Sequence, residues 1–303
     1  MTYSADTTRV GFMGLGRLGR PIATNLATDG YAVTGFDPDP AARARMESSA
    51  VRVTPEASQC AASSQVLITC LRGSDDVHAT LDLLSRAGSL LGIEALLDLS
   101  TISPGDSESL ARRLGKEGVS YLRVTVSGSA QAAAARQISL MCSGDHEHYK
   151  RCAPILDAVG RSHMWLGPEE EAKAAKVAVN MLVGVGLASL IESVRLAEGM
   201  GIDRQKFLDV VAQSAVSSPF FHAKTPALVN RDYTPAASLA LMVKDLELAA
   251  AVSADVGTTL PLTDFTRALY AACDAQGWAE RDFACLDELY DQPDKLPGAG
   301  EQE

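Results

Sequence analysis

The sequence predicts an α/β N-terminal domain with a Rossmann-like, doubly wound sheet, and an all-α C-terminal domain joined to it by a long interdomain helix. Short apolar runs alternate with helical patterns up to residue 167, and a glycine-rich turn follows the first run. After that, apolar residues recur only at helical spacing. We therefore expect domains over 8–167 and 168–291, with the interdomain helix over 168–199 and a flexible tail over 292–303.

The composition narrows the class of protein. The chain has 303 residues, 47% of them hydrophobic, and a formal net charge of −11. So acidic a chain is poorly suited to nucleic acid or an anionic membrane surface, and a small anionic substrate would need positive charge close to its site. No apolar run reaches the roughly 18 residues of a membrane span, and the first strand pattern begins too early to leave room for a signal peptide.

The cysteines indicate the compartment. All six are scattered along the chain without a C-x-x-C pair. This spacing favours reduced thiols in a cytoplasmic protein over a disulfide framework, and it predicts no metal site.

The first strand, Arg9–Met13, leads into the turn Gly14-Leu15-Gly16-Arg17-Leu18-Gly19 and a helix over Pro21–Thr28. In a dinucleotide-binding turn the first glycine permits the tight bend and the second lets the backbone approach a pyrophosphate. The third lets helix and strand pack closely, and the helix N-terminus supplies donors to the phosphates. A G-x-G-x-x-G pattern also occurs in purely structural turns, but its place between a strand and a helix favours the dinucleotide.

The second strand, Tyr31–Phe36, ends at Asp37, which follows Gly14 by the roughly 20 residues typical of this motif. A carboxylate there accepts a hydrogen bond from the ribose 2′-hydroxyl and repels a 2′-phosphate, so the sequence favours NAD over NADP. Arg43 and Arg45 on the next helix would offset this preference if they faced the cofactor, but not if they are simply solvated.

The remaining elements follow from the same alternation. Further strands are expected over Gln65–Leu71, Ala95–Leu99, Tyr121–Val126, Ile138–Cys142 and His163–Leu166. Helices are expected over Asp75–Ser85, Ala130–Ala135 and Tyr149–Val159. Another helix is expected to end at Leu114, with Ser103 or Asp106 as its N-terminal cap. The second domain is expected to contain helices over Asp203–Ala212, Phe221–Val229, Leu239–Val256, Pro261–Ala275 and Asp282–Tyr290.

Two loops at the ends of these strands are candidates for cofactor contact. Ligands of parallel sheets lie beyond the carboxyl ends of the strands, so loops 71–74 and 100–104 are expected to meet the cofactor. Leu71, Arg72 and above all Thr101 are the candidate contacts. Thr101 can instead be interpreted as a hydroxyl that only serves the entry to the next helix.

The long helix, Glu169–Gly199, carries two polar residues on an apolar face. Lys176 and Asn180 lie one turn apart and project from one side. An amine and an amide on such a face cost free energy unless something meets them. Either the two residues take part in catalysis, or the Lys176 side chain extends to solvent while Asn180 has hydrogen-bond partners in the core. The expected buried face comprises Ala172, Ala175, Val179, Val183, Gly186, Leu187, Leu190, Ile191, Val194 and Ala197.

Several motifs now stand in a definite order. They are the glycine-rich turn within Val10–Leu26, a D-x-S-T-x-x-P loop over Asp98–Pro104, a V-S-G-S loop over Val126–Ser129, a K-x-x-x-N helix over Lys176–Asn180 and a K-D-L-x-L-A segment over Lys244–Ala249. Together they resemble the β-hydroxyacid dehydrogenase family, relatives of 3-hydroxyisobutyrate and 6-phosphogluconate dehydrogenases. The Ser-Gly-Ser variant and the Ser218-Pro219-Phe220 and Asp232-Tyr233 stretches lean towards the glyoxylate and succinic-semialdehyde reductase branch.

The resemblance implies roles for particular residues. Lys176 would be the general acid/base, and Asn180 would hydrogen-bond the same substrate oxygen or hold the lysine. Ser127, Gly128 and Ser129 would bind a substrate carboxylate. Thr101 and Lys244 would line the nicotinamide end of NAD or NADP. An ammonium beside the reacting oxygen stabilises developing alkoxide charge, and burial or Lys244 would lower the pKa of Lys176.

The resemblance also implies an enzyme assembled as a homodimer or homotetramer, with a long helix that carries Lys176 and Asn180 between its domains. The implied reaction interconverts a small β-hydroxyacid and its oxo-acid or semialdehyde with NAD(P). An imine reductase is a second interpretation, although such enzymes usually carry Asp or Tyr where Lys176 stands. A non-catalytic dinucleotide sensor is a third, but it would not require a catalytic lysine.

The chain departs from the family pattern at a few positions. Arg123-Val124-Thr125 replaces the usual Asp-Ala-Pro before the substrate loop, Arg136 replaces a glycine, and Glu170-Glu171-Ala172 replaces a Gly-x-Gly. The arginines would bind a wider anionic substrate, with Arg123 as a substrate contact, or else they lie on the surface outside the pocket.

Overall fold

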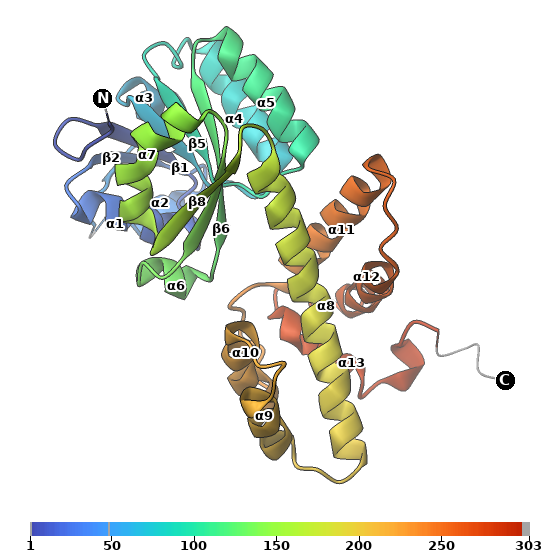
Figure 1. The fold of residues 1–303 in the computed structure, drawn as a ribbon. Coiled ribbons are helices and arrows are strands. Elements are labelled where there is room, and N and C mark those ends of the chain that lie inside the picture. The colour runs from blue at the N-terminus through green and yellow to red at the C-terminus, as the bar shows by residue number, and fades with distance from the viewer. Residues whose placement is uncertain (1, 48, 299–303) are drawn as a thin grey trace. The chain divides into compact units, whose positions relative to one another are not determined.

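The computed structural model describes residues 2–47 and 49–298 (Figure 1). The chain divides into two compact units, Met1–Lys176 and Val177–Glu303. The division falls inside the long helix α8 (Glu171–Gly199), whereas the sequence predicts a boundary just before this helix.

Within the described residues the first unit is built on an eight-stranded sheet in the order β3-β2-β1-β4-β5-β6-β7-β8. Neighbouring strands are parallel, except that β6 and β7 run antiparallel. The predicted doubly wound sheet is confirmed, and its order reverses between β1 and β4, the place where such sheets bind ligands. The strands are β1 (Arg9–Met13), β2 (Ala32–Phe36), β3 (Arg52–Val53), β4 (Val66–Thr69), β5 (Ala95–Asp98), β6 (Ser120–Ser127), β7 (Ser139–Ser143) and β8 (Ser162–Gly167).

Helices cover both faces of this sheet (Figure 1). On one face lie α1 (Gly19–Thr28), α6 (Ala130–Ala134) and α7 (His146–Val159); on the other lie α3 (Ala57–Ala62), α4 (Ser74–Arg86) and α5 (Pro104–Lys116). The short helix α2 (Pro40–Ala44) follows β2.

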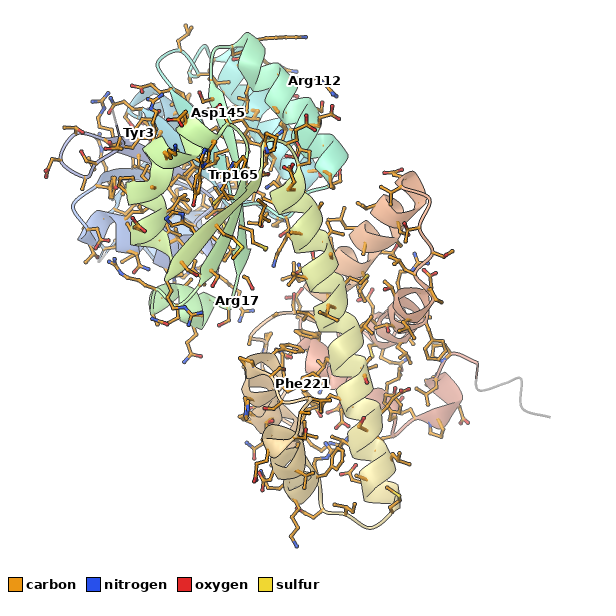
Figure 2. The ribbon with its side chains drawn as sticks, viewed as in Figure 1. Tyr3, Arg17, Arg112, Asp145, Trp165 and Phe221 are labelled. Atoms are coloured by element: carbon orange, nitrogen blue, oxygen red, sulfur yellow. The ribbon has the colours of Figure 1, made fainter. Side chains whose placement is uncertain are left out.

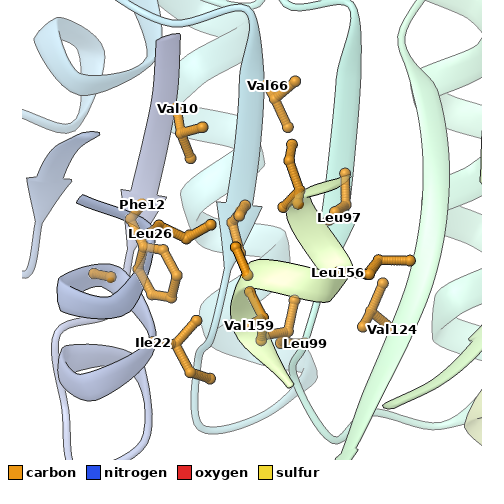
Figure 3. Close-up of a cluster of buried hydrophobic side chains, with 14 of the residues drawn as sticks. Val10, Phe12, Ile22, Leu26, Val66, Leu97, Leu99, Val124, Leu156 and Val159 are labelled. Atoms are coloured by element: carbon orange, nitrogen blue, oxygen red, sulfur yellow. The ribbon is translucent and has the colours of Figure 1, made fainter. Parts of the chain in front are cut away.

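The strand side chains alternate between the two cores, as the two-residue period of a strand requires. Val10 and Phe12 of β1 join the core beneath α1 and α7 (Figure 3), whereas Met13 joins the opposite core. Ile68 of β4 and its neighbour Leu67 divide in the same way. Because helices cover both faces of the sheet, both sets of strand side chains are buried, and the strands are continuous apolar runs in the sequence.

The predicted helices of the first unit are all present, and their starts follow local capping. The Ser103 side chain caps α5 by accepting a hydrogen bond from the Asp106 N–H at 3.0 Å. Asp145 caps α7 by accepting from the His148 N–H at 2.7 Å, which explains why α7 begins earlier than Tyr149 (Figure 2).

The second unit is helical, as predicted. Its elements are the greater part of α8, α9 (Arg204–Gln213), α10 (Pro219–Asn230), α11 (Leu239–Asp255), α12 (Pro261–Asp274), the 3₁₀ turn η1 (Phe283–Cys285), α13 (Leu286–Leu289) and the 3₁₀ turn η2 (Pro293–Lys295). Leu187, Ile191 and Val194 of α8 pack in its core together with Leu246 of α11 and Tyr270 of α12.

One expected helix begins differently. The span Asp282–Tyr290 starts as a 3₁₀ turn, and α13 follows only at Leu286. The reason is the buried Asp282 side chain, which accepts hydrogen bonds from the N–H groups of Ala284, Ala236 and Ala237 and from Lys224 Nζ. These bonds hold the Asp282 carboxylate to the segment before α11 as well as to its own turn.

The expected buried face of α8 is correct from Leu187 to Ala197 and wrong at Val179, which is 37% exposed. The buried stripe instead passes through Val177 and Gly184. A Cβ at Gly184 would approach Met242 Sδ to 2.9 Å and the Leu246 side chain to 3.1 Å, so the absence of a side chain there lets α11 pack closely.

By length and composition α8 is also apolar enough to cross a membrane, since an 18-residue stretch of it has a mean hydropathy of 1.8. A helix at the centre of a folded core can be equally long and apolar, and 44% of that stretch is buried inside the protein. Of the expected tail, 292–303, residues 299–303 lie outside the described residues, and Leu296 packs against the core of the second unit.

Candidate active site

The glycine-rich turn after β1 needs glycine at two positions. Gly14 has a φ of +99°, and a Cβ there would lie 2.2 Å from the Cys70 carbonyl oxygen. A Cβ on Gly19 would lie 1.9 Å from the Gly14 carbonyl oxygen. Real side chains cannot occupy either space, so these glycines let the strand, turn and helix approach one another.

Gly16 differs from its neighbours because a Cβ there would meet nothing within 4 Å. The backbone at Gly16 is exposed, and α1 begins next to it without a side-chain hydrogen bond at its N-cap, Leu18. Open backbone beside an uncapped helix N-terminus suits a pyrophosphate. The turn therefore fits the dinucleotide that the sequence predicts, and it lies at the reversal of the strand order.

The other side chains of the turn differ in their exposure to solvent. Leu15 is buried in the core beneath α1, so only its backbone is available to a ligand. Arg17 is exposed, and it extends from this turn at the edge of the unit (Figure 2). Leu18 packs partly buried against the same core as Leu15.

Asp37 at the end of β2 is hydrogen-bonded to the turn. Its Oδ2 accepts from the Leu15 N–H at 2.8 Å, and its Oδ1 accepts from the Asp39 N–H at 2.9 Å. Arg43 Nη1 donates to the Asp37 carbonyl oxygen at 2.6 Å, and Arg45 pairs with Asp39 at 3.6 Å. Both arginines therefore have partners on their own segment, and neither forms an ion pair with the Asp37 carboxylate at the end of β2.

The loops after β4 and β5 are joined by a hydrogen bond, because Leu71 N–H donates to Ser100 Oγ at 3.0 Å. Arg72 is largely exposed and binds both Asp76 oxygens, at 2.7 and 3.0 Å. The pKa of Arg72 is raised, chiefly by Asp76 and to a smaller extent by Asp37. Since Ser103 caps α5, the helix-entry role considered for Thr101 belongs to another residue.

The expected substrate loop lies exposed at the end of β6. Gly128 has a φ of +140°, and a Cβ there would meet Ile138 Cγ2 at 2.8 Å. The Ser129 hydroxyl accepts from the Ala132 N–H at 3.2 Å and caps α6. Ser129 thus shapes the loop, while Ser127 and the Gly128 backbone present its exposed surface.

Arg123 does not lie on the surface. It is 7% exposed, its guanidinium pairs with the Glu170 carboxylate, and it lies over the Tyr121 ring at 4.9 Å. Arg123 and Glu170 are two of the departures from the family pattern, and here each neutralises the other. The Arg123 Nε and Glu170 Oε2 atoms are buried and have no hydrogen-bond partner among the described residues.

Arg136 takes the surface role considered for it. It binds both oxygens of Asp29, at 2.5 and 2.7 Å, and its Nη2 also donates to the Asn25 carbonyl oxygen. Its φ is +57°, a backbone conformation that glycine adopts readily and that explains a glycine at this position in the family pattern. Arg136 therefore ties the segment after α6 to α1.

Lys176 and Asn180 lie one turn apart on α8, and both are half-buried. Asn180 Nδ2 donates to Asp245 Oδ2 of α11 at 2.6 Å, and Asp245 is 5% exposed. Lys244 Nζ lies 3.5 Å from Asp245 Oδ1. Asp245 is thus a further candidate site residue, and its place beside Lys244 in the K-D-L-x-L-A segment is the sequence signal that points to it.

Sequence reasoning missed Lys173, which is fully buried one turn before Lys176. Its Nζ lies 2.8 Å from Asp98 Oδ2, and neither side chain is exposed to solvent. No three side chains of His, Cys, Asp or Glu within 2–47 and 49–298 are placed to hold a metal ion.

The fold and the turn define the class of an NAD(P)-binding dehydrogenase, and comparisons with known proteins give the family. Residues 9–167 match the NAD-binding domain of 6-phosphogluconate dehydrogenase. Residues 171–290 match the model described as the NAD-binding part of NADP-dependent 3-hydroxyisobutyrate dehydrogenase. The chain belongs to this β-hydroxyacid dehydrogenase family of NAD(P)-dependent oxidoreductases.

Individual relatives agree with this assignment. A probable 3-hydroxyisobutyrate dehydrogenase of Mycobacterium tuberculosis is 31% identical, over 92% of this chain and 96% of its own. The chloroplastic glyoxylate/succinic semialdehyde reductase 2 of Arabidopsis thaliana is 29% identical, over 93% of this chain and 79% of its own. An NAD-dependent L-serine dehydrogenase of Pseudomonas aeruginosa is 28% identical, over 93% of this chain and 98% of its own.

Solved structures separate the two enzyme interpretations. The M. tuberculosis 3-hydroxyisobutyrate dehydrogenase with L-serine has a TM-score of 0.84 at 30% identity and covers 93% of this chain and 99% of its own. An imine reductase from Pseudomonas sp. has a TM-score of 0.63 at 20% identity, covering 93% of this chain and 99% of its own, which shows a shared fold alone.

Proposed function

We propose that this protein interconverts a small β-hydroxyacid and its oxo-acid or semialdehyde, with Lys176 as the general acid/base. The observation that carries the proposal is the placement of Lys176 on α8. One turn before it, α8 is bonded to the carboxyl end of β5, beside the loops expected to meet the cofactor. One turn after it stands Asn180, whose amide is held by a buried carboxylate.

When bound at the Gly14–Gly19 turn, NAD(P) would supply the hydride, or would accept it in the oxidative direction. Lys176 Nζ donates a proton to the substrate oxygen during reduction and recovers it during oxidation. An ammonium at that oxygen also stabilises the negative charge that develops before the proton moves. Asn180 hydrogen-bonds the same oxygen, and Asp245 fixes the orientation of its amide because it accepts from Asn180 Nδ2 at 2.6 Å.

The substrate carboxylate is proposed to bind at the exposed end of β6. Ser127 offers a hydroxyl and Gly128 a backbone N–H, the donor types that a carboxylate accepts. Arg123 gives this proposal less support than expected, because its charge is already neutralised by Glu170. Thr101 and Lys244 are proposed to line the nicotinamide end of the cofactor, and Gly14–Gly19, Leu71 and Arg72 the remainder.

We propose NAD as the preferred cofactor. Asp37 presents a carboxylate where the adenosine ribose lies in this class of fold, and that charge repels a 2′-phosphate. Arg43 and Arg45, which could have offset the repulsion, bind the backbone after β2 and Asp39 instead.

We further propose a homodimer or homotetramer in the cytoplasm. Large apolar side chains of the second unit are exposed, among them Leu182 and Leu196 of α8 and Leu262 and Phe265 of α12, and such surfaces favour association. The six cysteines are free thiols, which suits a reducing compartment. Light scattering on the purified chain measures the assembly, and a monomer at micromolar concentration would contradict it.

A panel assay tests the proposed activity. The relatives' names suggest the substrates, namely 3-hydroxyisobutyrate, L-serine, glyoxylate and succinic semialdehyde, each measured with both cofactors. Turnover of at least one with NAD(H) is expected. Cofactor binding without turnover of any hydroxyacid or oxo-acid would favour a non-catalytic sensor, and turnover of imines alone would favour an imine reductase.

A further inference from the structure

Lys173 forms the most deeply buried ion pair of the first unit. Its Nζ donates to Asp98 Oδ2 at 2.8 Å, to the Asp98 carbonyl oxygen at 3.0 Å and to the Ser100 carbonyl oxygen at 2.8 Å. A charged ammonium has three N–H donors, so each has an acceptor here. A neutral amine would have one donor fewer and would leave a buried carbonyl oxygen without a partner.

The Asp98 carboxylate is equally well surrounded. Oδ1 accepts from Thr69 Oγ1 at 2.8 Å and from the Ser100 N–H at 3.0 Å, and Oδ2 accepts from Tyr121 OH at 3.2 Å as well as from Lys173. Burial alone would raise the pKa of Asp98, but Lys173 and these hydrogen bonds hold it below its usual value. Burial in turn lowers the pKa of the Lys173 amine.

These bonds connect three segments that the proposed function brings to the cofactor. Asp98 and Ser100 lie at the end of β5, immediately before Thr101. Ser100 Oγ accepts from the Leu71 N–H, which holds the loop after β4. Lys173 lies in the first turns of α8, with Lys176 one turn further along. We call Asp98, Ser100 and Lys173 the β5–α8 clamp.

We infer that Lys173 is a positioning residue for hydride transfer: through the β5–α8 clamp it holds the turn that bears Lys176 at a fixed place relative to loop 100–104. The inference rests on the proposed function, in which that loop meets the nicotinamide. Lys173 itself is buried and touches neither substrate nor cofactor. Reactions of this kind lose rate steeply when reacting groups are displaced by about 1 Å, so a loosened clamp slows the chemical step before it affects binding.

The test must remove the clamp without leaving a buried charge. Lys173→Met alone would strand the Asp98 carboxylate and endanger folding. The double variant K173M/D98N removes both charges, and the amide oxygen at position 98 can still accept from Thr69 Oγ1 and the Ser100 N–H. We expect a folded protein that binds NADH within about threefold of wild type and loses at least about tenfold in kcat.

A kinetic isotope effect separates positioning from stability. With NADH deuterated at the transferred position, the isotope effect on kcat is expected to rise in the double variant, because hydride transfer becomes slower relative to product release. The matched control is R204M/D287N in the second unit, where Arg204 Nη1 lies 2.6 Å from the buried Asp287 carboxylate. The control is expected to lower Tm and to keep the wild-type kcat and isotope effect.

A milder variant covers the possibility that the double variant does not fold. Thr69→Val removes one of the two donors to Asp98 Oδ1 and leaves both charges paired. It should lower kcat and raise the isotope effect in the same directions, with little change in NADH affinity. A folded clamp variant, K173M/D98N or Thr69→Val, with the wild-type kcat and isotope effect would overturn the inference.

Failure of the proposed function would look different. Wild-type protein would then turn over no substrate of the panel, or Lys176→Ala would remain active. If wild type is active, Lys176→Ala is inactive and the clamp variants behave as wild type, only the positioning role of Lys173 is wrong.

Discussion

The backbone N–H of Leu15 donates to the Asp37 carboxylate at 2.8 Å, so the turn that follows β1 and the residue that follows β2 are held as one piece. This bond places a negative charge beside the open backbone of Gly16. The carboxylate stabilises the shape of the turn, and its proposed second function is to repel a phosphate on the adenosine ribose.

The variant Asp37→Asn separates these functions. The amide oxygen still accepts from the Leu15 N–H, which retains the turn, whereas the bond from the Asp39 N–H to the other carboxylate oxygen is lost. The repulsion of a 2′-phosphate disappears with the charge. We expect the ratio of kcat/KM with NADPH to that with NADH to rise by about tenfold, equivalent to about 1.4 kcal/mol. Steady-state kinetics with both cofactors measures it, and a wild type that already prefers NADPH would contradict the role assigned to Asp37.

Two glycines of the turn should respond differently to alanine. In Gly19→Ala the new Cβ would lie 1.9 Å from the Gly14 carbonyl oxygen, so the strand and helix must separate and Tm should fall. In Gly16→Ala the Cβ meets nothing within 4 Å, so Tm should be unchanged. It would nevertheless stand where a pyrophosphate approaches, and the Kd for NADH should rise about tenfold or more.

Calorimetry and NADH titration on both variants test this contrast. If Gly16→Ala bound NADH as tightly as wild type, the pyrophosphate would not lie against this turn.

The pair formed by Arg123 and Glu170 should act on stability and not on substrate affinity. Arg123→Met leaves the Glu170 carboxylate, whose side chain is only 17% exposed, without its partner, which costs up to about 3 kcal/mol of unfolding free energy. The double variant R123M/E170Q should recover most of that loss, because it removes both charges. Urea denaturation measures both values. A KM for substrate that rises about tenfold in the folded double variant would restore Arg123 as a substrate contact.

His148 predicts a pH dependence of stability. Burial, and secondarily the nearby Arg151, lower the pKa of this buried histidine from 6.5 to about 4. Between these values the unfolded chain binds the proton and the folded chain does not, so stability decreases as the pH falls from about 6.5 towards 4. The contribution is about 3 kcal/mol in all.

The variant His148→Phe isolates this effect. The difference in unfolding free energy between wild type and variant should change across that pH range and remain constant above it, as measured by urea denaturation at several pH values. A difference that is independent of pH would show that His148 does not titrate in this way.

Local sequence patterns predict most of the fold and several residues of the candidate site. The alternation of apolar runs located the strands, and the glycine spacing located the turn where Gly14 and Gly19 prove sterically necessary. Helical spacing places Lys176 and Asn180 on one face, and the resemblance to the family makes them predicted site residues. Such features are encoded within a few residues of each other, where period and residue type suffice.

The parts that escaped prediction depend on distant partners. Lys173 is bonded to a residue 75 positions away and Arg123 to one 47 positions away, and nothing in either segment specifies the other. Val179 fits the buried face by residue type, yet it is 37% exposed, and the buried face passes instead through Gly184, where α11 packs closely. The Asp282 turn likewise depends on N–H groups at residues 236 and 237.

The most direct test of the central claim is Lys176→Ala, assayed with the best substrate of the panel while NADH affinity is measured separately. Loss of the proton donor and of the positive charge at the reacting oxygen should lower kcat by about 10²–10⁴-fold. NADH affinity should stay within about twofold, because Lys176 is assigned to the substrate oxygen and not to the cofactor. Turnover at the wild-type rate in Lys176→Ala would contradict the proposed mechanism.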